Sequence, residues 1–344
     1  MESLESSRIS SVTPISRVIW DLTYACPLLC KHCYSESGRR PARMLDRTRM
    51  RRVAQVIIAA GPERVSFSGG EPLLVPWWGE AADLLCQAGI PITVFTSGWA
   101  MNQGMAERLA TSVAAVTVSV DGWDESAHDA IRGRAGSFRR AMAALDQLSR
   151  VKLSRAERGE KHFRLGIDYT VTRSGHNGLG DFVAEATSRF PNLDYVRFGA
   201  VMPVGLAQEP GFVGAELLSD AELEALVGAE PELISRAENG IEVSVTDIRS
   251  FLPTSPLSLD GEGIAQIEPD GQLRAFACYE AKIGNVLDEP IDVLWERAIA
   301  WRNSPFVRAQ TSSVYNLTDW ARAARVLDRR YGSEADKARI AHRN

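Results

Sequence analysis

The sequence predicts an α/β fold: a partial (β/α)6 TIM-like barrel followed by a smaller C-terminal α+β extension. Over residues 17–210, short β-branched segments alternate regularly with amphipathic helical segments. Such alternation indicates a parallel sheet with helices on its outside. From residue 211 to 344 this rhythm stops, and a chain of 344 residues is long enough for a large domain with an appendage.

The barrel elements follow one another in order. Residues 1–16 are rich in serine and have no apolar signal core, so we expect a flexible tail. Asp46 stands at the N-cap position of the first helix, which ends at Gly61, and Ser137 can cap a helix that runs to Arg150 before a charged connection over 151–162. The six strands are expected at residues 18–22, 64–68, 92–96, 115–120, 163–172 and 195–201.

The C-terminal extension has a different pattern. A helix is expected over 219–227 and an extended segment over 241–246. Pro269-Asp270-Gly271 is typical of a turn between two hairpin strands, and a helix follows around 293–295. The arginines of the last helical segment alternate with acids, which indicates a solvated helix.

Composition excludes several classes of protein. The net charge of -5 argues against nucleic acid as the main partner. No segment reaches the apolar length of a membrane span. Five cysteines are an odd set for a secreted disulfide framework. We therefore expect a cytoplasmic protein with reduced thiols.

Cys26, Cys30 and Cys33 stand in the loop after the first strand, at spacings of four and three residues. Thiolates are the usual ligands of iron–sulfur clusters, and a cubane with only three of them keeps one iron open. The alternative is a zinc site completed by His32 or by a distant residue. Zinc knuckles usually combine two closely spaced pairs of ligands, and no second pair follows here.

Several motifs together resemble the radical S-adenosylmethionine (radical SAM) superfamily. The triad matches its CxxxCxxC signature, and Gly69-Gly70-Glu71-Pro72 matches its GGEP motif. The run from Val118 to Phe138 is similar to one found in members with a SPASM or twitch extension. Cys278 and the following Ile283-Gly284-Asn285-Val286 look like the start of such an extension around 265–300. No cysteine follows Cys278, so we expect a degenerate extension without an auxiliary cluster.

The resemblance implies the cofactors and the chemistry. Cys26, Cys30 and Cys33 would hold a [4Fe-4S] cluster whose open iron chelates S-adenosylmethionine. A flavodoxin- or ferredoxin-type donor would supply the electron that cleaves this cofactor to methionine and a 5'-deoxyadenosyl radical. The radical would take a hydrogen atom from the substrate. In barrels of this kind the chemistry lies at the C-terminal ends of the strands, where these motifs fall.

The GGEP motif is expected to contact S-adenosylmethionine. Gly69 and Gly70 have no Cβ, so the backbone can pass close to the cofactor. Glu71 offers a carboxylate to the ammonium group of the cofactor. The same tetrapeptide on its own would more often be an ordinary turn.

Five further residues are candidates for cofactor binding. Ser97 and Ser119 end neighbouring strands and can bond the methionyl or ribose groups, although strand-end serines are often local caps. Arg132 can pair with the cofactor carboxylate, although an arginine is often a surface ion pair. By resemblance, His32 and Tyr34 would lie near the adenine, with loop packing as the alternative.

The substrate site is expected inside the barrel. Asp168 and Tyr169 face opposite ways in the fifth strand, so only one points inward. An inward Asp168 would need a partner, such as a substrate hydroxyl. Cys278 can donate a hydrogen atom to a substrate radical, although an isolated cysteine is more often a small buried hydrophobe. Four indoles that follow motifs can either wall the mouth or pack under helices: Trp77, Trp78, Trp99 and Trp123.

Three functions remain open, and fold resemblance alone does not decide among them. We favour hydrogen abstraction from a small polar molecule, of sugar, nucleoside or aminocyclitol type, in secondary metabolism such as antibiotic biosynthesis. The outcome would be epimerisation, dehydration or decarboxylation of a hexuronic-acid nucleoside. The alternative is epimerisation or cross-linking of a ribosomally made peptide, which the run from His128 to Phe138 favours by association. The short N-terminus, without room for a leader-binding domain, and the missing auxiliary cysteines speak against it. A non-catalytic binding protein is third, and retention of the three cysteines and Glu71 argues against it.

Overall fold

The computed structural model describes residues 13–160, 163–255 and 263–343. These residues form one sheet in the order β10-β9-β8-β1-β2-β3-β4-β5-β6-β7. The strands are β1 (Arg17–Thr23), β2 (Arg64–Gly69), β3 (Ile92–Thr96), β4 (Ala115–Ser119), β5 (Arg164–Val171), β6 (Tyr195–Ala200), β7 (Glu242–Thr246), β8 (Ile264–Ile267), β9 (Gln272–Arg274) and β10 (Lys282–Asn285).

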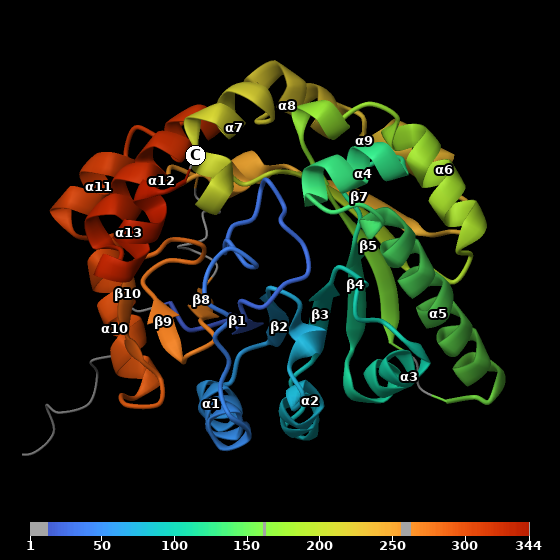
Figure 1. The fold of residues 1–344 in the computed structure, drawn as a ribbon, viewed down its shortest axis with the longest axis horizontal. Coiled ribbons are helices and arrows are strands. Elements are labelled where there is room, and N and C mark those ends of the chain that lie inside the picture. Colours follow the sequence, from blue (N-terminus) through green and yellow to red (C-terminus); the bar gives the residue numbers. More distant parts are fainter. Residues whose placement is uncertain (1–12, 161–162, 256–262, 344) are drawn as a thin grey trace, which may run out of the picture.

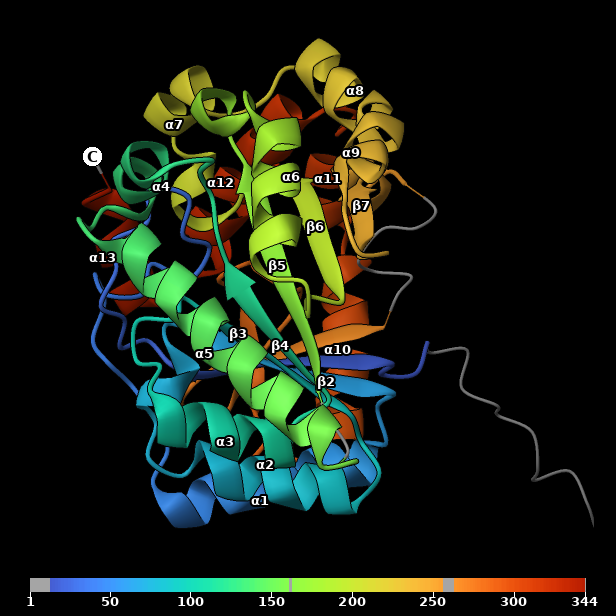
Figure 2. The same ribbon diagram turned by 90° about the vertical axis from the view of Figure 1, so that its right-hand side faces the viewer.

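The first six strands are parallel and adjacent in sequence order, as the alternating pattern predicts. These strands curve into an arc whose outer face is covered by helices (Figure 1). Figure 2 shows α5 and α6 crossing the outside of this arc. The partial-barrel fold is therefore confirmed. The helices of this part are α1 (Arg47–Ala60), α2 (Trp78–Gln87), α3 (Gln103–Ser112), α4 (Glu125–Arg132), α5 (Ser137–Glu157) and α6 (Leu179–Arg189).

The core lies between the arc and its outer helices. Trp20 of β1 and Phe67 of β2 are fully buried and meet edge to face, with ring centroids 5.6 Å apart. Each such side chain contributes about 1.5–3 kcal/mol by leaving water. Helix α1 begins at the expected N-cap, where Asp46 accepts a bond from the backbone N–H of Arg49 at 2.8 Å, and ends at Gly61 in the left-handed region. Its buried face consists of Met50, Val53, Ala54 and Ile57.

Helix α5 differs from its prediction at both ends. Ser137 does not cap it: the N-cap is Gly136 at φ 79°, and the Ser137 hydroxyl donates to Asp129 Oδ1 at 2.7 Å. The helix continues to Glu157, so most of the expected charged connection is helical. The reason is that Val151 and Lys152 face inward, and the Lys152 ammonium donates to the carbonyl of Asn192 at 2.8 Å.

The C-terminal part joins both edges of the same sheet. Strand β7 pairs in parallel with β6, and β8 pairs in parallel with β1. Strands β8 and β9 are antiparallel, which confirms the predicted hairpin at Pro269-Asp270-Gly271, and β10 follows them. The remaining helices are α7 (Pro210–Ala215), α8 (Asp220–Gly228), α9 (Glu230–Arg236), α10 (Ile291–Arg302), α11 (Pro305–Thr311), α12 (Leu317–Tyr331) and α13 (Glu334–Ala341).

Strands from both sides of the expected domain boundary at residue 210 thus share one sheet. That boundary stays a prediction, and residues 1–12 of the expected tail lie outside the described residues. No helix in the described part of the chain is long and apolar enough to cross a bilayer.

Candidate active site at the mouth of the barrel

The cysteine loop leaves β1 and rises into the middle of the arc (Figure 1). Cys26, Cys30 and Cys33 are all free thiols. Burial raises the pKa of Cys26 to about 12 and that of Cys30 to about 11, and the neighbouring thiols of the triad raise both further. The three sulfurs are therefore close enough to interact electrostatically.

A single-ion zinc site would require ligands that converge on one point. Among the described residues, no three His, Cys, Asp or Glu side chains converge in this way. His32, the candidate fourth ligand, directs Nε2 to Asp121 Oδ2 at 3.1 Å. In an iron–sulfur cluster the thiolates bind different irons, so a looser triad suits a cluster better.

The two glycines of the GGEP motif pack against the start of the cysteine loop. The backbone N–H of Gly70 donates to the carbonyl of Thr23 at 2.7 Å, and that of Glu71 donates to the carbonyl of Ala25 at 2.9 Å. A Cβ on Gly69 would lie 2.6 Å from Thr23 O, and one on Gly70 would lie 2.2 Å from Ala25 O. Both positions therefore require glycine for packing within the chain itself, whatever they contact in the cofactor.

The Glu71 carboxylate is completely buried and fully engaged within the protein. It accepts bonds from the Thr96 hydroxyl at 2.8 Å, the Ser97 N–H at 2.9 Å, the Ser97 hydroxyl at 2.5 Å and the Leu73 N–H at 3.3 Å. Burial raises the pKa of Glu71, and these bonds oppose the increase. Four donors match the capacity of a carboxylate. The structure thus gives Glu71 and the Ser97 hydroxyl a role in joining β2 to β3, and the contact of Glu71 with the cofactor ammonium stays a prediction.

Asp121 is a central residue that the sequence interpretation did not select. Its Oδ2 lies 2.5 Å from Arg132 Nε, and the Arg132 guanidinium also approaches Cys30 Sγ at 3.8 Å. Burial alone would raise the pKa of Asp121, but Arg132 and then His32 lower it well below its usual range. The available signal was its position, because Asp121 directly follows the predicted strand that ends in Ser119-Val120.

The Tyr34 hydroxyl is held between β1 and β2. It donates to Asp21 Oδ1 at 2.7 Å, lies 3.0 Å from Ser68 Oγ and accepts from the backbone N–H of Gly69 at 3.2 Å. Burial raises the pKa of Asp21 to about 6, and the bond from Tyr34 opposes that increase. These contacts fix the phenol, so only its ring remains to contact a ligand.

A cavity of about 420 Å³ opens beside the cysteine loop. Four of the predicted site residues line it: His32, Tyr34, Asp168 and Cys278. The remaining lining is mainly apolar and comes from β1, β2, β3, β5, β6, β7 and the segments that follow β6 and β7. It consists of Ile19, Ser66, Ser68, Phe95, Tyr169, Thr170, Phe198, Gly199, Ala200, Val201, Met202, Val204, Thr246, Ile248 and Phe251.

Asp168 points into the barrel. Of the two adjacent residues Asp168 and Tyr169, the aspartate is therefore the inward one. Its neighbours in register are Ser119 on β4 and Arg197 on β6. Tyr169 is buried and donates its hydroxyl to the carbonyl of Gly175 at 3.0 Å. Within the described residues the Asp168 carboxylate has no hydrogen-bond partner, and burial raises its pKa to about 6, with Asp121 adding to the increase. The cavity therefore contains a carboxyl group that is free for a substrate.

Cys278 reaches the same cavity from the segment after β9. Its backbone is in the left-handed region at φ 70°, and its N–H donates to Gln266 Oε1 at 2.5 Å. The other end of the Gln266 amide donates to Asp21 Oδ2 at 2.7 Å. Burial raises the pKa of the thiol to about 12, so Cys278 is present as S–H.

The tryptophans do not line the cavity. Trp78, the first residue of α2, is buried, and Trp77 donates its indole N–H to the carbonyl of Leu45 at 3.1 Å. Trp99 lies under the guanidinium of Arg134, and Trp123 is 46% exposed. Trp77 and Trp78 are thus packed inside the protein, which is one of the two predicted alternatives. None of the four tryptophans lines the cavity.

Comparison with known proteins identifies the family. Residues 20–168 match the model of the Radical SAM superfamily. The chain therefore contains a radical SAM domain. It is 29% identical to the Mycofactocin maturase MftC of Mycobacterium ulcerans over 82% of this chain and 75% of the relative.

Further relatives have different names. The chain is 24% identical to the AdoMet-dependent heme synthase of Methanosarcina barkeri, over 83% of each protein. It is 27% identical to the sporulation killing factor maturation protein SkfB of Bacillus subtilis, over 62% of this chain and 48% of the relative. Its fold resembles Streptococcus suis SuiB bound to the precursor peptide SuiA, with a TM-score of 0.62 and 14% identity over 86% of this chain and 66% of that one.

The protein is thus a radical SAM enzyme that uses a [4Fe-4S] cluster and S-adenosylmethionine. The residues present fit these groups. Cys26, Cys30 and Cys33 would hold the cluster, and Arg132 beside Cys30 offsets the negative charge of the thiolates. His32 Nδ1 is buried without a partner among the described residues and lines the cavity, so it is available to the cofactor. When bound, the two groups supply a radical that abstracts hydrogen.

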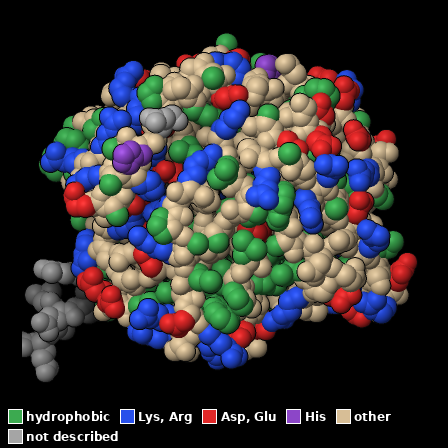
Figure 3. Space-filling model, viewed as in Figure 1, with side chains coloured by type: hydrophobic (Ala, Val, Ile, Leu, Met, Phe, Trp, Pro, Cys, Tyr) green, Lys and Arg blue, Asp and Glu red, His purple; other side chains and the backbone are tan. Residues whose placement is uncertain are grey.

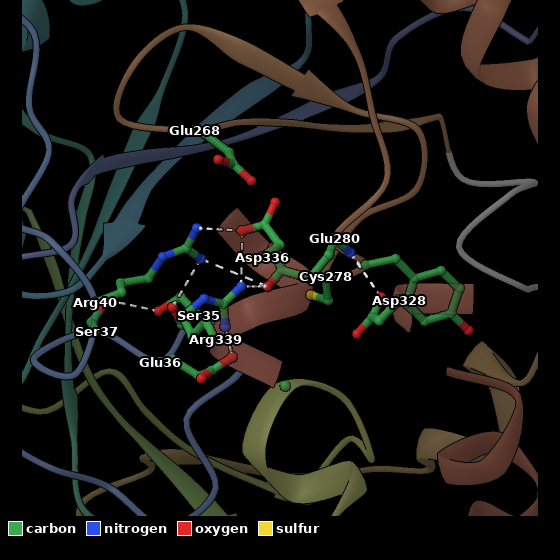
Figure 4. Close-up of polar contacts among 12 residues, drawn as sticks. Ser35, Glu36, Ser37, Arg40, Glu268, Cys278, Glu280, Asp328, Asp336 and Arg339 are labelled. Carbon is green, nitrogen blue, oxygen red and sulfur yellow. Dashed lines mark hydrogen bonds and ion pairs between the residues drawn. The ribbon is translucent and has the colours of Figure 1, made fainter. Parts of the chain in front are cut away.

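The residues after Cys33 are fixed by buried ion pairs with the C-terminal helices (Figure 4). Arg40 pairs with Asp336 of α13 at 3.2 Å, and Arg339 of α13 pairs with Glu280 at 3.0 Å and also with Glu36. Because charges so deeply buried are stable only when paired, this network holds the cysteine loop in one position. The C-terminal extension therefore supports the cluster-binding loop through ion pairs.

Proposed function

We propose that this radical SAM enzyme modifies a peptide, by epimerisation or cross-linking. The observation that carries the proposal is the similarity to MftC, which extends over 82% of the chain and so well beyond the barrel motifs. The name of SkfB refers to maturation of a killing factor, and the fold resembles a protein that binds a precursor peptide. These relatives do not favour the sugar-type substrate that we expected from the sequence.

The cavity is suited to this reaction. Its lining is mainly apolar, with Asp168 as an acidic group that can bond a peptide amide or a polar side chain. Cys278 is the proposed hydrogen donor in an epimerisation: its S–H bond breaks, a C–H bond forms on the substrate carbon, and a sulfur radical remains. The external one-electron donor, of flavodoxin or ferredoxin type, and a proton from water then restore the thiol.

The test is product analysis under anaerobic conditions. The reconstituted and reduced enzyme is incubated in D2O with S-adenosylmethionine and a precursor peptide encoded beside its gene. We expect 5'-deoxyadenosine together with a peptide that has gained deuterium or lost two hydrogen atoms. A Cys30→Ala variant is the control, because it lacks a cluster ligand and should form neither product.

A small-molecule substrate remains the second candidate, because the relative from Methanosarcina barkeri is named as a heme synthase. In the same assay a tetrapyrrole replaces the peptide. If 5'-deoxyadenosine forms with the tetrapyrrole and every peptide returns unchanged, the peptide proposal is wrong.

A further inference from the structure

Four cationic side chains surround the outer side of the cysteine loop. We call them the cationic collar: Lys31, Arg39, Arg134 and Arg140. All four are exposed, and none forms an ion pair within the described part of the chain. In the view of Figure 3, which is that of Figure 1, blue Lys and Arg side chains lie around the middle of the molecule.

Two residues of the collar, Arg39 and Arg134, bond backbone carbonyls of the cluster-binding loop. Arg39 donates to the carbonyl of Leu29 at 2.5 Å and to the carbonyl of Cys30 at 3.1 Å. Arg134 donates to the carbonyl of Pro27 at 2.8 Å. Neither guanidinium has a carboxylate partner among the residues that the structure describes. The exposed Arg39 thus bonds the backbone carbonyl of Cys30, which is itself a predicted cluster ligand.

An aromatic ring and an aliphatic side chain complete this surface. Arg134 and Arg140 lie over the Trp99 ring at 4.4 and 5.4 Å from its centroid. Such stacking keeps the cations over the indole and away from acids. Leu29, whose carbonyl accepts a bond from Arg39, is 43% exposed and adds an apolar side chain to this surface. Apolar contacts ringed by charge are the usual composition of a small protein interface.

The collar does not belong to the substrate site. The cavity is lined by His32 and Tyr34 from the inner side of the loop, whereas neither Leu29 nor any collar residue lines it. A partner on the collar would therefore meet the cluster-binding loop without meeting the substrate. An electron carrier docked here would need no access to the cavity.

We propose that the cationic collar is the docking surface of an acidic one-electron carrier protein. The carrier loses one electron and the cluster gains it, with no bond made or broken. Opposite charges accelerate such encounters, and the interfaces of electron-transfer pairs are small. The proposal rests on the cofactors and is independent of the substrate assigned above, so either can fail alone.

The test is the rate at which flavodoxin hydroquinone reduces the reconstituted enzyme, followed by stopped-flow absorbance. In the triple variant Arg39→Gln, Arg134→Gln and Arg140→Gln we expect the second-order rate constant to fall about tenfold at low ionic strength. The difference should shrink at high salt, because screening removes long-range attraction. Affinity for oxidised flavodoxin, measured by calorimetry, should fall in parallel.

Two further variants separate charge from structure. A control triple variant removes three exposed arginines elsewhere that also have no carboxylate partner within the described residues: Arg52→Gln, Arg64→Gln and Arg150→Gln. This variant should leave the rate unchanged. Replacing the three collar arginines with lysine keeps the charge and should preserve most of the rate. Iron content and the absorption of the cluster should be equal in all variants, which shows that the loop is intact.

Three results would overturn the proposal. The first is an equal loss of rate in the collar and control variants. The second is a lysine variant as slow as the glutamine variant, which would assign the effect to the bonds with the loop. The third is loss of binding of an acidic peptide in the glutamine variant while flavodoxin reduces it normally, which would assign the surface to a peptide.

Discussion

Asp121 and Arg132 form a buried ion pair, with 2.5 Å between Oδ2 and Nε. Arg132 in turn lies 3.8 Å from the sulfur of Cys30, so the pair connects the end of β4 to the cysteine loop. Removing one partner of a buried pair leaves an uncompensated charge and costs about 3–5 kcal/mol. We expect Asp121→Asn to lower the free energy of unfolding by this amount in urea titrations.

The control for Asp121 is Asp124, which lies in the same segment. Asp124 caps α4 by accepting from the N–H of Ala127 at 2.7 Å, and asparagine caps helices equally well. Asp124→Asn should therefore leave stability unchanged. The pKa of Asp121 is lowered in the folded state, so its contribution is complete above the unfolded pKa and is lost only as the pH falls through the folded value. An Asp121→Asn effect that varied between pH 6 and 8 would contradict this assignment.

Ser97 and Ser119 end neighbouring strands but have different surroundings. The Ser97 hydroxyl donates to Glu71 at 2.5 Å, whereas Ser119 has no hydrogen-bond partner for its side chain within the described residues. Ser97→Ala should lower stability by about 1.5–3 kcal/mol, because it removes a bond to a buried carboxylate. Ser119→Ala should change stability by less than about 0.5 kcal/mol.

Binding of S-adenosylmethionine separates the two serines further. If Ser119 contacts the cofactor as predicted, Ser119→Ala should weaken binding about fivefold in calorimetry with no loss of stability. Unchanged affinity in that variant would remove Ser119 from the cofactor site. A stable Ser97→Ala variant would mean that Glu71 does not depend on this bond.

Arg274 connects β9 to the buried part of the ion network. It is completely buried, and its guanidinium lies 2.8 Å from Glu268 and donates to the carbonyl of Tyr279 at 2.9 Å. Arg274→Met leaves Glu268 without its main partner, so we expect a loss of about 3–5 kcal/mol in urea titrations.

The matched control is Arg297→Met, which removes an exposed arginine paired with Glu289 at 2.7 Å. Water screens that pair, so stability should not change measurably. Equal effects of the two substitutions would show that the buried network does not hold the extension in place.

The parts of the fold that local pattern determines could be predicted. The strands β1–β6 are apolar runs bounded by turn residues, and Asp46 and Gly61 delimit α1 by the chemistry of their caps. The end of α5 could not be predicted, because charged side chains recur over residues 151–157. The inward position of Val151 and Lys152 depends on the sheet against which they pack.

The site was predicted where residues stand next to motifs and missed where partners come from elsewhere. The triad follows from its position after the first strand, and Asp168 follows from the alternation of side chains within the fifth strand. The bonds from Thr96 and Ser97 to Glu71 require knowledge that β3 lies beside β2. Asp121 was missed because its partner Arg132 becomes a neighbour only after α4 folds back over the loop.

Asp168 should make stability depend on pH between about 4 and 6. Burial raises its folded pKa from 3.8 to about 6, so the folded state binds more protons than the unfolded state in this range. Stability therefore falls as the pH rises through this window, by at most about 3 kcal/mol. Asp168→Asn should remove the slope, so that the variant gains stability over the wild type as the pH rises from 4 to 7.

The charged groups around Asp168 set the size of this effect. Asp121 adds to the increase in pKa, whereas Arg132 and Arg197 oppose it. Urea titrations at several pH values measure the slope for both proteins. Parallel stability curves for wild type and Asp168→Asn would show that this carboxyl titrates normally and that the cavity does not favour its neutral form.

Two substitutions at Cys278 separate the effect of losing its thiol from the effect of its backbone strain. Its φ of 70° is strained for any residue with a Cβ, and glycine relieves about 1 kcal/mol of such strain. Cys278→Gly should therefore be more stable than Cys278→Ala in urea titrations. Both variants lack the thiol, so any shared loss of function belongs to the S–H group.

The reaction itself gives the decisive comparison for Cys278. With S-adenosylmethionine and a peptide substrate, both variants should still form 5'-deoxyadenosine, because the Cys278 thiol is not one of the three predicted cluster ligands. The peptide should no longer acquire deuterium from D2O at the substrate carbon, because the exchangeable donor is absent. Cys86 is exposed on α2, away from the cavity, so Cys86→Ala is the matched control and should behave like the wild type. Undiminished deuterium incorporation in Cys278→Ala would assign the hydrogen donor to another residue.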